Sequence, residues 1–390
     1  MHLDQFINFG PWNGDSISAF WNWNIYTNQR HLAFSIGVGL LIIWPLVKAV
    51  FDQTYTKTTN KLSWLLIAIG LMALPFLNLA VYMMVIIFIV LWLGLNPRLL
   101  KKFSLGYGLA TLCSLLSFYY YWALGGNILQ WQVGFLAQEK TWLGIIYYWW
   151  RNLGLYVVLW PVIFLKSNWN QKKWLLIFSF YFVLANLFQL STDMINNHKL
   201  INFFQIGFSM LLAAKLGEVW TQSILKKVLV LLLLVPLTLS GVMDALAIMR
   251  DRPLTLTDAI YQPMGSWIVQ ETDPQSVFIT TAYLYNPVSF TGRKTYLDYG
   301  YFDWSMGYQT QGRRDNLKTI FALEQNQSDW CDLLTQEKID YILISPGKGD
   351  LEFDAHHSWL VRTWRPVYQS MDGYLIFSIN QICSPELQPL

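Results

Sequence analysis

The stretch 62–96, LSWLLIAIGLMALPFLNLAVYMMVIIFIVLWLGLN, contains no charged residue. A helix of about 20 apolar residues crosses the roughly 30 Å hydrocarbon core of a bilayer, so this stretch is too long for a single crossing. Pro75 and Asn78 interrupt it, and proline disfavours the straight continuation of a helix. The stretch therefore predicts two membrane spans joined by a tight turn.

Apolar runs of the same kind lie on both sides of this pair. Some of these runs are shorter than a full crossing, and such short spans would tilt little or lie where the bilayer is thinned. Together with the pair they predict an α-helical polytopic membrane bundle of about eight spans. The other six runs cover residues 31–51, 103–124, 152–165, 174–190, 200–216 and 228–248.

The composition divides the chain into regions. Hydrophobic residues make up 54% and charged residues 13%, whereas a soluble domain carries roughly a quarter charged residues. Charges reach ordinary density only after residue 250, so we predict an N-terminal segment (1–30), a transmembrane domain (31–249) and a small α/β domain (250–390). The last is predicted to contain helices over 257–270, 314–324 and 328–337, with Ser328 as N-cap, and strands over 277–281, 341–345 and 374–379.

Lysine and arginine fall mostly in one set of loops when eight spans alternate in direction. Basic loops stay in the cytoplasm, so segments 1–30, 125–151 and 191–199 and the C-terminal domain are predicted to face outward. This predicts a multi-pass cell-membrane protein with an extracytoplasmic domain. The inward set is Lys48, Lys57, Lys61, Arg98, Lys101, Lys102, Lys166, Lys172, Lys173, Lys215, Lys226 and Lys227, and the outward set is Arg30, Lys140, Arg151 and Lys199.

Tryptophan and tyrosine cluster at the predicted span ends, as in 119–122 and 147–150. Such rings collect where hydrocarbon meets headgroups, so membrane lipid is an expected partner. The net charge of +3 comes from the loops. The sequence contains no basic stripe with interleaved aromatic residues, which is the pattern that would indicate nucleic-acid binding.

The three cysteines show no metal-type spacing. Cys113 lies inside a predicted span and is expected to fill apolar space. Cys331 and Cys383 fall in the domain predicted to be extracytoplasmic, where a disulfide is chemically permitted. The sequence leaves their pairing open, because it does not show that the two sulfurs meet.

Polar residues concentrate in the short predicted loop 191–199, STDMINNHK. At the start of a helix, Asn197, His198 and Lys199 can offer donors and a positive helix end to an anionic group such as a lipid-linked phosphate, with Asp193 beside them. The alternative is a solvated turn in which Lys199 reaches the headgroups. Arg151, after a Tyr-Tyr-Trp-Trp run, is the second phosphate candidate, or else a simple anchor for a span. No metal, phosphate-loop or nucleophile motif accompanies them.

The order of several loose motifs resembles one family. These are Asn28-Gln29-Arg30-His31 before a span, the Leu74-Pro75 break, the run 148–155, Asn196-Asn197-His198-Lys199 before another span, and Phe290-Thr291-Gly292-Arg293-Lys294 in the tail. In this order they resemble the C-terminal part of the multi-spanning, lipid-phosphate-sugar-dependent (GT-C type) membrane glycosyltransferases. The resemblance implies a polyprenyl-phosphate-linked sugar as donor and an extracytoplasmic acceptor.

In that family a catalytic carboxylate in the first large outward loop acts as base or as metal ligand. Only Asp4 and Asp15 precede the first span here, and no paired acidic motif does. The expectation is therefore that a missing N-terminal portion or partner chain supplies the carboxylate, with the need for a divalent metal left open. The alternative class is a non-catalytic transporter or assembly partner of a cell-envelope polysaccharide pathway.

Overall fold

The computed structural model describes residues 21, 23–52, 61–122, 129–249, 262–280, 287–297, 303–304, 308–322, 327–345 and 358–384. The chain divides into two compact units, Met1–Arg252 and Pro253–Leu390. The division falls close to residue 250, where the charge density of the sequence changes. We describe each unit by itself.

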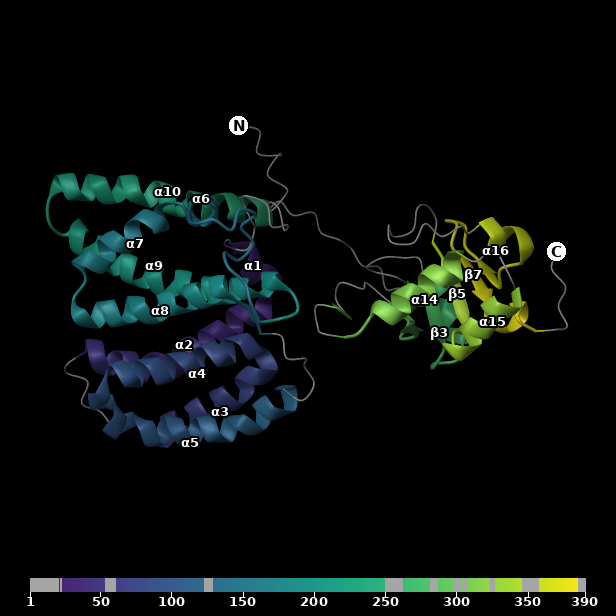
Figure 1. Ribbon diagram of the computed structural model, residues 1–390, viewed down its shortest axis with the longest axis horizontal. Helices are drawn as coiled ribbons and strands as arrows, with labels where there is room; N and C mark the ends of the chain where they lie inside the picture. Colours follow the sequence, from purple (N-terminus) through teal and green to yellow (C-terminus); the bar gives the residue numbers. More distant parts are fainter. Residues whose placement is uncertain are drawn as a thin grey trace. The chain divides into compact units, whose positions relative to one another are not determined.

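The first unit is a bundle of helices that lie roughly side by side (Figure 1). A two-stranded antiparallel sheet pairs Gln130 with Gln189 and Trp131 with Phe188. The elements are α1 (Trp23–Asn28), α2 (Arg30–Phe51), α3 (Lys61–Leu77), α4 (Leu79–Leu95), α5 (Pro97–Trp122), β1 (Gln130–Trp131), α6 (Trp142–Leu153), α7 (Leu155–Lys166), α8 (Trp169–Leu187), β2 (Phe188–Gln189), the 3-10 helix η3 (Met194–Asn197), α9 (His198–Trp220) and α10 (Ile224–Met249).

The predicted break in the 62–96 stretch lies at Asn78, between α3 and α4. Asn78 has extended backbone angles, and its side chain accepts a hydrogen bond from Val81 N at 3.3 Å, which caps α4. Pro75 stays inside the last turn of α3. The proline therefore precedes the turn, and the asparagine makes it.

Aromatic rings and a close glycine contact hold the middle of the bundle together. Trp92 on α4 and Trp174 on α8 meet edge to face, with ring centroids 6.1 Å apart. Trp174 Nε1 donates to the carbonyl of Gly207 on α9 at 2.7 Å. A Cβ on Gly207 would lie 2.2 Å from the Phe178 ring, so glycine is what allows α8 and α9 to approach this closely.

Two expectations about the helical unit are wrong in detail. The run 152–165 is not one helix, because Gly154, with φ of 52°, separates α6 from the 12-residue α7. Cys113 is exposed on the outer surface of α5, so it fills no space in the core. Both outcomes depend on backbone breaks and helix rotation that composition does not encode.

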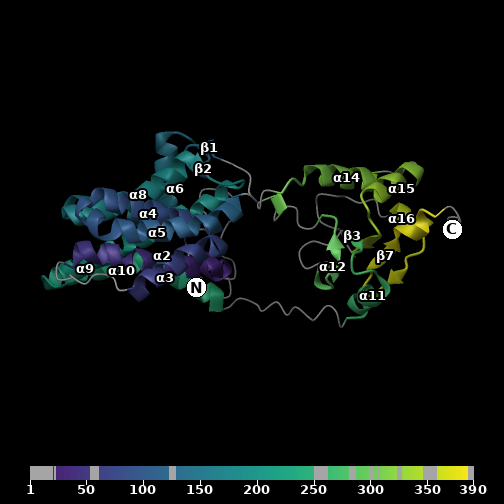
Figure 2. The same ribbon diagram turned by 90° about the horizontal axis from the view of Figure 1, so that it is seen from below.

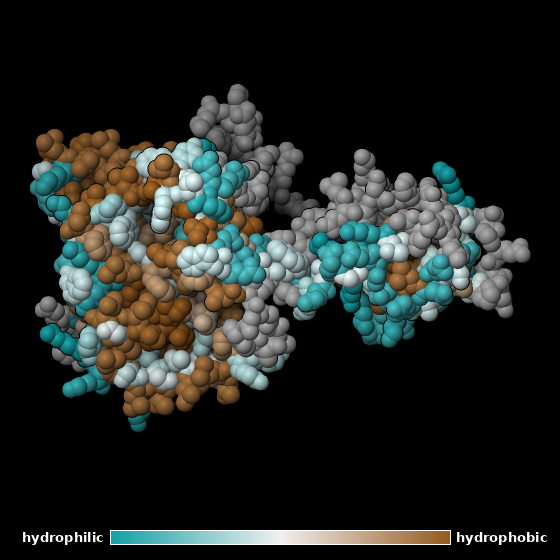
Figure 3. Space-filling model, in the orientation of Figure 1, coloured by the Kyte–Doolittle hydropathy of each residue, from teal (hydrophilic) through white to brown (hydrophobic). Residues whose placement is uncertain are grey.

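Within the described residues, three helices are long and apolar enough to cross a membrane: Arg30–Phe51, Met194–Trp220 and Ile224–Leu246. Shorter apolar helices cover Lys61–Leu77, Leu79–Leu95 and Leu155–Lys166. Almost none of the Ile224–Leu246 segment is buried inside the unit. Figure 3 shows hydrophobic side chains across the visible face of the helical unit, as expected for a surface that meets lipid rather than water.

The helices alternate in direction, which sorts their connections to two ends. At one end, which we call the entry end, α2 and α9 begin and α8 and α10 finish. Trp23 N there donates to Asp244 Oδ2 at 3.2 Å, and β1 pairs with β2. At the opposite end Lys173 Nζ donates to Asn96 Oδ1 at 2.7 Å. Most of the lysines in the described part of the helical unit lie toward this opposite end.

The second unit is built on a five-stranded mixed sheet of order β4-β3-β5-β7-β6. β3 is parallel to β4 and β5, whereas β7 is antiparallel to β5 and β6. The elements are α11 (Pro263–Glu271), β3 (Val277–Thr280), α12 (Pro287–Phe290), β4 (Lys294–Thr295), α14 (Gln311–Ala322), α15 (Gln327–Gln336), β5 (Tyr341–Ile344), α16 (Ser358–Thr363), β6 (Tyr368–Gln369), β7 (Leu375–Ser378) and α17 (Ile379–Ile382).

Both faces of this sheet are covered, because successive side chains of a strand point to opposite faces. Ile279 and Phe377 pack with α14, α15, α16 and α17, while Phe278 and Ile376 pack with α11 and α12. Figure 2 shows α14 and α15 on one side of β3 and β7 and α11 and α12 on the other. The second unit is thus a three-layer α/β domain.

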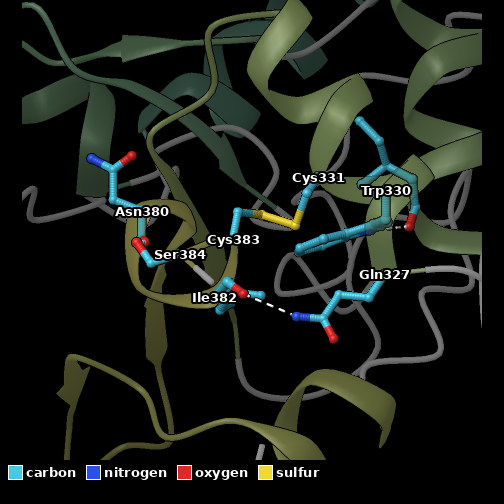
Figure 4. The surroundings of a disulfide bond; sticks show 8 residues. Gln327, Trp330, Cys331, Asn380, Ile382, Cys383 and Ser384 are labelled. Atoms are coloured by element: carbon cyan, nitrogen blue, oxygen red, sulfur yellow. Dashed lines mark hydrogen bonds between the residues drawn. A yellow bond between two sulfur atoms is a disulfide. The ribbon is translucent and has the colours of Figure 1, made fainter. Parts of the chain in front are cut away.

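The three predicted strands of the tail are β3, β5 and β7, and the predicted helices differ at their starts. The first begins at Pro263, and residues 257–261 lie outside the described part. Ser328 is not the cap of α15 but its second residue, because the helix begins at Gln327. Cys331 on α15 and Cys383 after α17 form a disulfide with their Cα atoms 5.6 Å apart (Figure 4). The pairing that the sequence left open is therefore made.

Candidate functional site

The turn between α8 and α9 is ordered by its own polar side chains. Asp193 is buried and caps η3, because its Oδ1 accepts from Ile195 N at 3.0 Å. Ser191 Oγ donates to the carbonyl of Asp193 at 2.6 Å. This places the carboxylate of Asp193 inside the turn rather than in open solvent.

Asn197 is almost completely buried and ties the turn to the end of α8. Its Nδ2 donates to the carbonyls of Ala185 and Phe188 at 3.1 and 2.5 Å, and its Oδ1 accepts from Leu190 N at 3.3 Å. These contacts fix the position at which α9 begins. Asn197 therefore supports the site instead of presenting donors to a ligand.

His198 is the first residue of α9 and is 1% exposed. Its Nδ1 lies 2.7 Å from the carbonyl oxygen of Ile195. A carbonyl only accepts, so Nδ1 carries the proton and donates it to the backbone. The ring is oriented by this bond and sits beneath the surface of the turn.

Lys199 is the half-buried cation of the site. Its Nζ donates to Asn196 Oδ1 at 3.1 Å, and the carboxylate of Asp193 attracts it from farther away. His31 is exposed at the start of α2, at the same end of the bundle. α2 and α9 thus each begin with a basic side chain at the entry end.

Arg151 does not join this cluster. It lies on the exposed surface of α6, where Nη1 donates to Tyr147 Oη at 2.9 Å and the guanidinium sits 5.7 Å from the centroid of the Tyr147 ring. The structure therefore groups Asp193, Asn197, His198 and Lys199 and places Arg151 on a separate element.

Trp149, Trp21 and Phe182 form an aromatic wall beside the turn, so Trp149 is buried and is not one of the headgroup-level rings expected for 147–150. Trp149 Nε1 donates to Asn186 Oδ1 at 2.9 Å, and its ring packs against Trp21 and Phe182. Asn186 is a buried amide in an otherwise apolar run. A polar residue in such a run is the sequence feature that indicates this hydrogen bond. The wall connects Trp21, which precedes α1, with α6 and with the last turns of α8.

The loop before α6 is also tied down at this end. Lys140 Nζ donates to the carbonyl of Phe135 at 2.8 Å. Partial burial lowers the pKa of Lys140, because desolvation disfavours the charged amine. Lys140 therefore stabilises the loop through its hydrogen bond to the backbone.

Two further polar residues, Asp244 and Arg293, have structural roles. Asp244 accepts the N–H of Trp23 and so joins α10 to α1. Arg293 Nη2 donates to the carbonyls of Val269 and Thr272 at 2.9 and 2.8 Å and caps the end of α11.

The described residues contain no group of three or more His, Cys, Asp or Glu side chains that could hold a metal ion. The fold and the apolar helices together define a predominantly helical, membrane-associated protein with a small sheet-containing domain. No family model matches the chain, and no curated protein matches it either.

Proposed function

We propose that this chain is a membrane glycosyltransferase, or the C-terminal part of one, that transfers a sugar from a polyprenyl-phosphate donor to an acceptor outside the cytoplasm. The observation that carries the proposal is the half-buried Lys199, whose Nζ donates to Asn196 Oδ1 at 3.1 Å in the polar turn before α9. Lipid-linked phosphates reside at the membrane surface, where the ends of membrane-spanning helices lie.

The membrane arrangement that goes with this proposal has eight crossings, made by α2, α3, α4, α5, α7, α8, α9 and α10. The alternating directions of these helices and the concentration of lysines toward the opposite end support it. The entry end then faces outward, and the α/β domain that follows α10 is extracytoplasmic. The 12-residue α7 crosses where the bilayer is thinned.

In this site Lys199 would hold the donor phosphate at the start of α9. When the bond between the sugar and the phosphate breaks, the leaving polyprenyl phosphate gains negative charge. A fixed ammonium group and the positive end of a helix stabilise that charge as it develops. Asp193, Asn197 and His198 position Lys199 through the backbone contacts of the turn.

Replacement of Lys199 tests this assignment directly. In nanodiscs supplied with a labelled polyprenyl-phosphate sugar and an acceptor, Lys199→Ala is expected to reduce the transfer rate by about 10²-fold, because one preorganised cation is lost from the leaving group. Lys199→Arg, which keeps the charge, should retain part of the rate. Binding of polyprenyl phosphate is measured in parallel.

The matched control is Lys215→Ala, which removes a lysine of the same helix far from the entry end. Lys215 is half-buried near the end of α9 and pairs with Glu218 at 2.8 Å, away from the proposed site, so its loss should leave transfer and binding unchanged. Unchanged transfer and binding in Lys199→Ala would refute the assignment of the phosphate site.

One observation favours a non-catalytic membrane protein as the second candidate, either a transporter or an assembly partner in a cell-envelope polysaccharide pathway. Asp193 and Asp244 each accept a backbone N–H, so both carboxylates serve the fold. Binding of polyprenyl phosphate that depends on Lys199, without sugar transfer by the wild-type chain, would favour this candidate over the transferase.

A further inference from the structure

α6 has an unusual distribution of side chains around its axis. One face is buried and contains Tyr148, Trp149 and the half-buried Asn152. The other face is exposed and almost entirely apolar or aromatic, with Trp142 83% and Leu143 80% exposed. Ile146, Tyr147 and Trp150 continue this face, and Arg151 lies at its edge.

The buried face anchors α6 at the entry end. Trp149 bonds to Asn186 near the end of α8, and Asn152 Oδ1 accepts from Trp21 Nε1 at 2.8 Å. Tyr148 lies next to Phe135 in the preceding loop. The central and last turns of the helix thus contact segments of this end of the bundle, rather than the middle of a neighbouring helix.

The chemistry of the exposed face matches the boundary between headgroups and acyl chains. Tryptophan and tyrosine combine an apolar ring with a polar N–H or O–H and concentrate at that depth. The helix carries no acidic residue, and Arg151, its one basic residue, complements the phosphates of lipid headgroups. α6 has 12 residues and is about 18 Å long, as is α7, but the hydrogen bonds of Trp149 and Asn152 hold α6 at the entry end.

We propose that α6 lies within the interfacial region of a phospholipid bilayer, with its Trp142–Trp150 face inserted among the lipids and Arg151 at the level of the headgroup phosphates. This inference depends on the membrane embedding that accompanies the proposed function, but it does not depend on sugar transfer. Gly154, with its positive φ, separates this interfacial helix from α7.

Spin-label depth measurements on the full chain in phosphatidylcholine–phosphatidylglycerol vesicles test the proposal. Labels are attached to single cysteines at Leu143, Ile146 and Trp150 in a Cys113→Ser background, with the Cys331–Cys383 disulfide intact. Collisions with oxygen and with a water-soluble nickel complex report the depth. Leu232, exposed on α10, provides the deep reference, and Met371, exposed in the α/β domain, provides the aqueous reference.

The expected result is a shallow, nearly equal depth for the three α6 labels, well above that of Leu232. A depth that increases by about 10 Å from position 143 to position 150 would overturn the proposal, because α6 would then be the outer half of a broken span. Accessibility to nickel equal to that of Met371, or protection from both reagents, would also overturn it. A Leu232 label in water would instead refute the membrane arrangement itself.

Discussion

At the scale of the residue, Asn197 shows how one buried amide can define where a helix begins. Its side chain bonds to two carbonyls and one N–H around the end of α8. Removing one member of such a network leaves the others unsatisfied, which costs about 1–3 kcal/mol for each buried group. The stability of the turn therefore depends on a residue that touches no proposed ligand.

We expect Asn197→Ala to lower the thermal unfolding temperature of the chain in detergent and to weaken the binding of polyprenyl phosphate indirectly, by releasing the start of α9. Asn196→Ala is the control, because its half-buried side chain accepts one hydrogen bond from Lys199. This control should reduce binding with little change in unfolding temperature. Equal unfolding temperatures for wild type and Asn197→Ala would contradict the structural role.

At the scale of the element, the packing of α8 on α9 depends on a single missing Cβ. Gly207 lies so close to the Phe178 ring that a Cβ at this position would clash with it. Overpacking of this kind typically costs about 1–3 kcal/mol, because the neighbouring ring and the two helices must move apart. The hydrogen bond from Trp174 to the carbonyl of Gly207 would be strained by the same movement.

Gly207→Ala is therefore expected to lower the unfolding temperature, measured by loss of helical circular dichroism in detergent. Gly217 lies on the same helix, and a Cβ there would meet nothing within 4 Å. Gly217→Ala should be neutral or stabilising by about 0.5–1 kcal/mol, since alanine is the better helix former. A Gly207→Ala chain as stable as the Gly217→Ala chain would show that the two helices do not approach this closely.

At the scale of the whole molecule, the proposed arrangement fixes which surfaces a membrane-impermeant reagent reaches. Single cysteines at Gln138, before α6, and at Met371, in the α/β domain, should react with an impermeant maleimide in intact cells. A cysteine at Ser223, between α9 and α10, should react only after permeabilisation. Labelling of Met371 that requires permeabilisation would refute the extracytoplasmic position of the α/β domain.

The sequence by itself determined the apolar runs, the break near Asn78 and three buried strands of the tail. These depend on local properties, namely the transfer free energy of each side chain and the backbone preference of each residue. Only the tertiary structure decided that Asn197 and His198 are buried, that Lys199 bonds to Asn196, that Arg151 lies on a separate element, and that Cys331 meets Cys383. Those outcomes depend on how each helix is rotated and on contacts between residues distant in sequence, which packing of the whole chain selects.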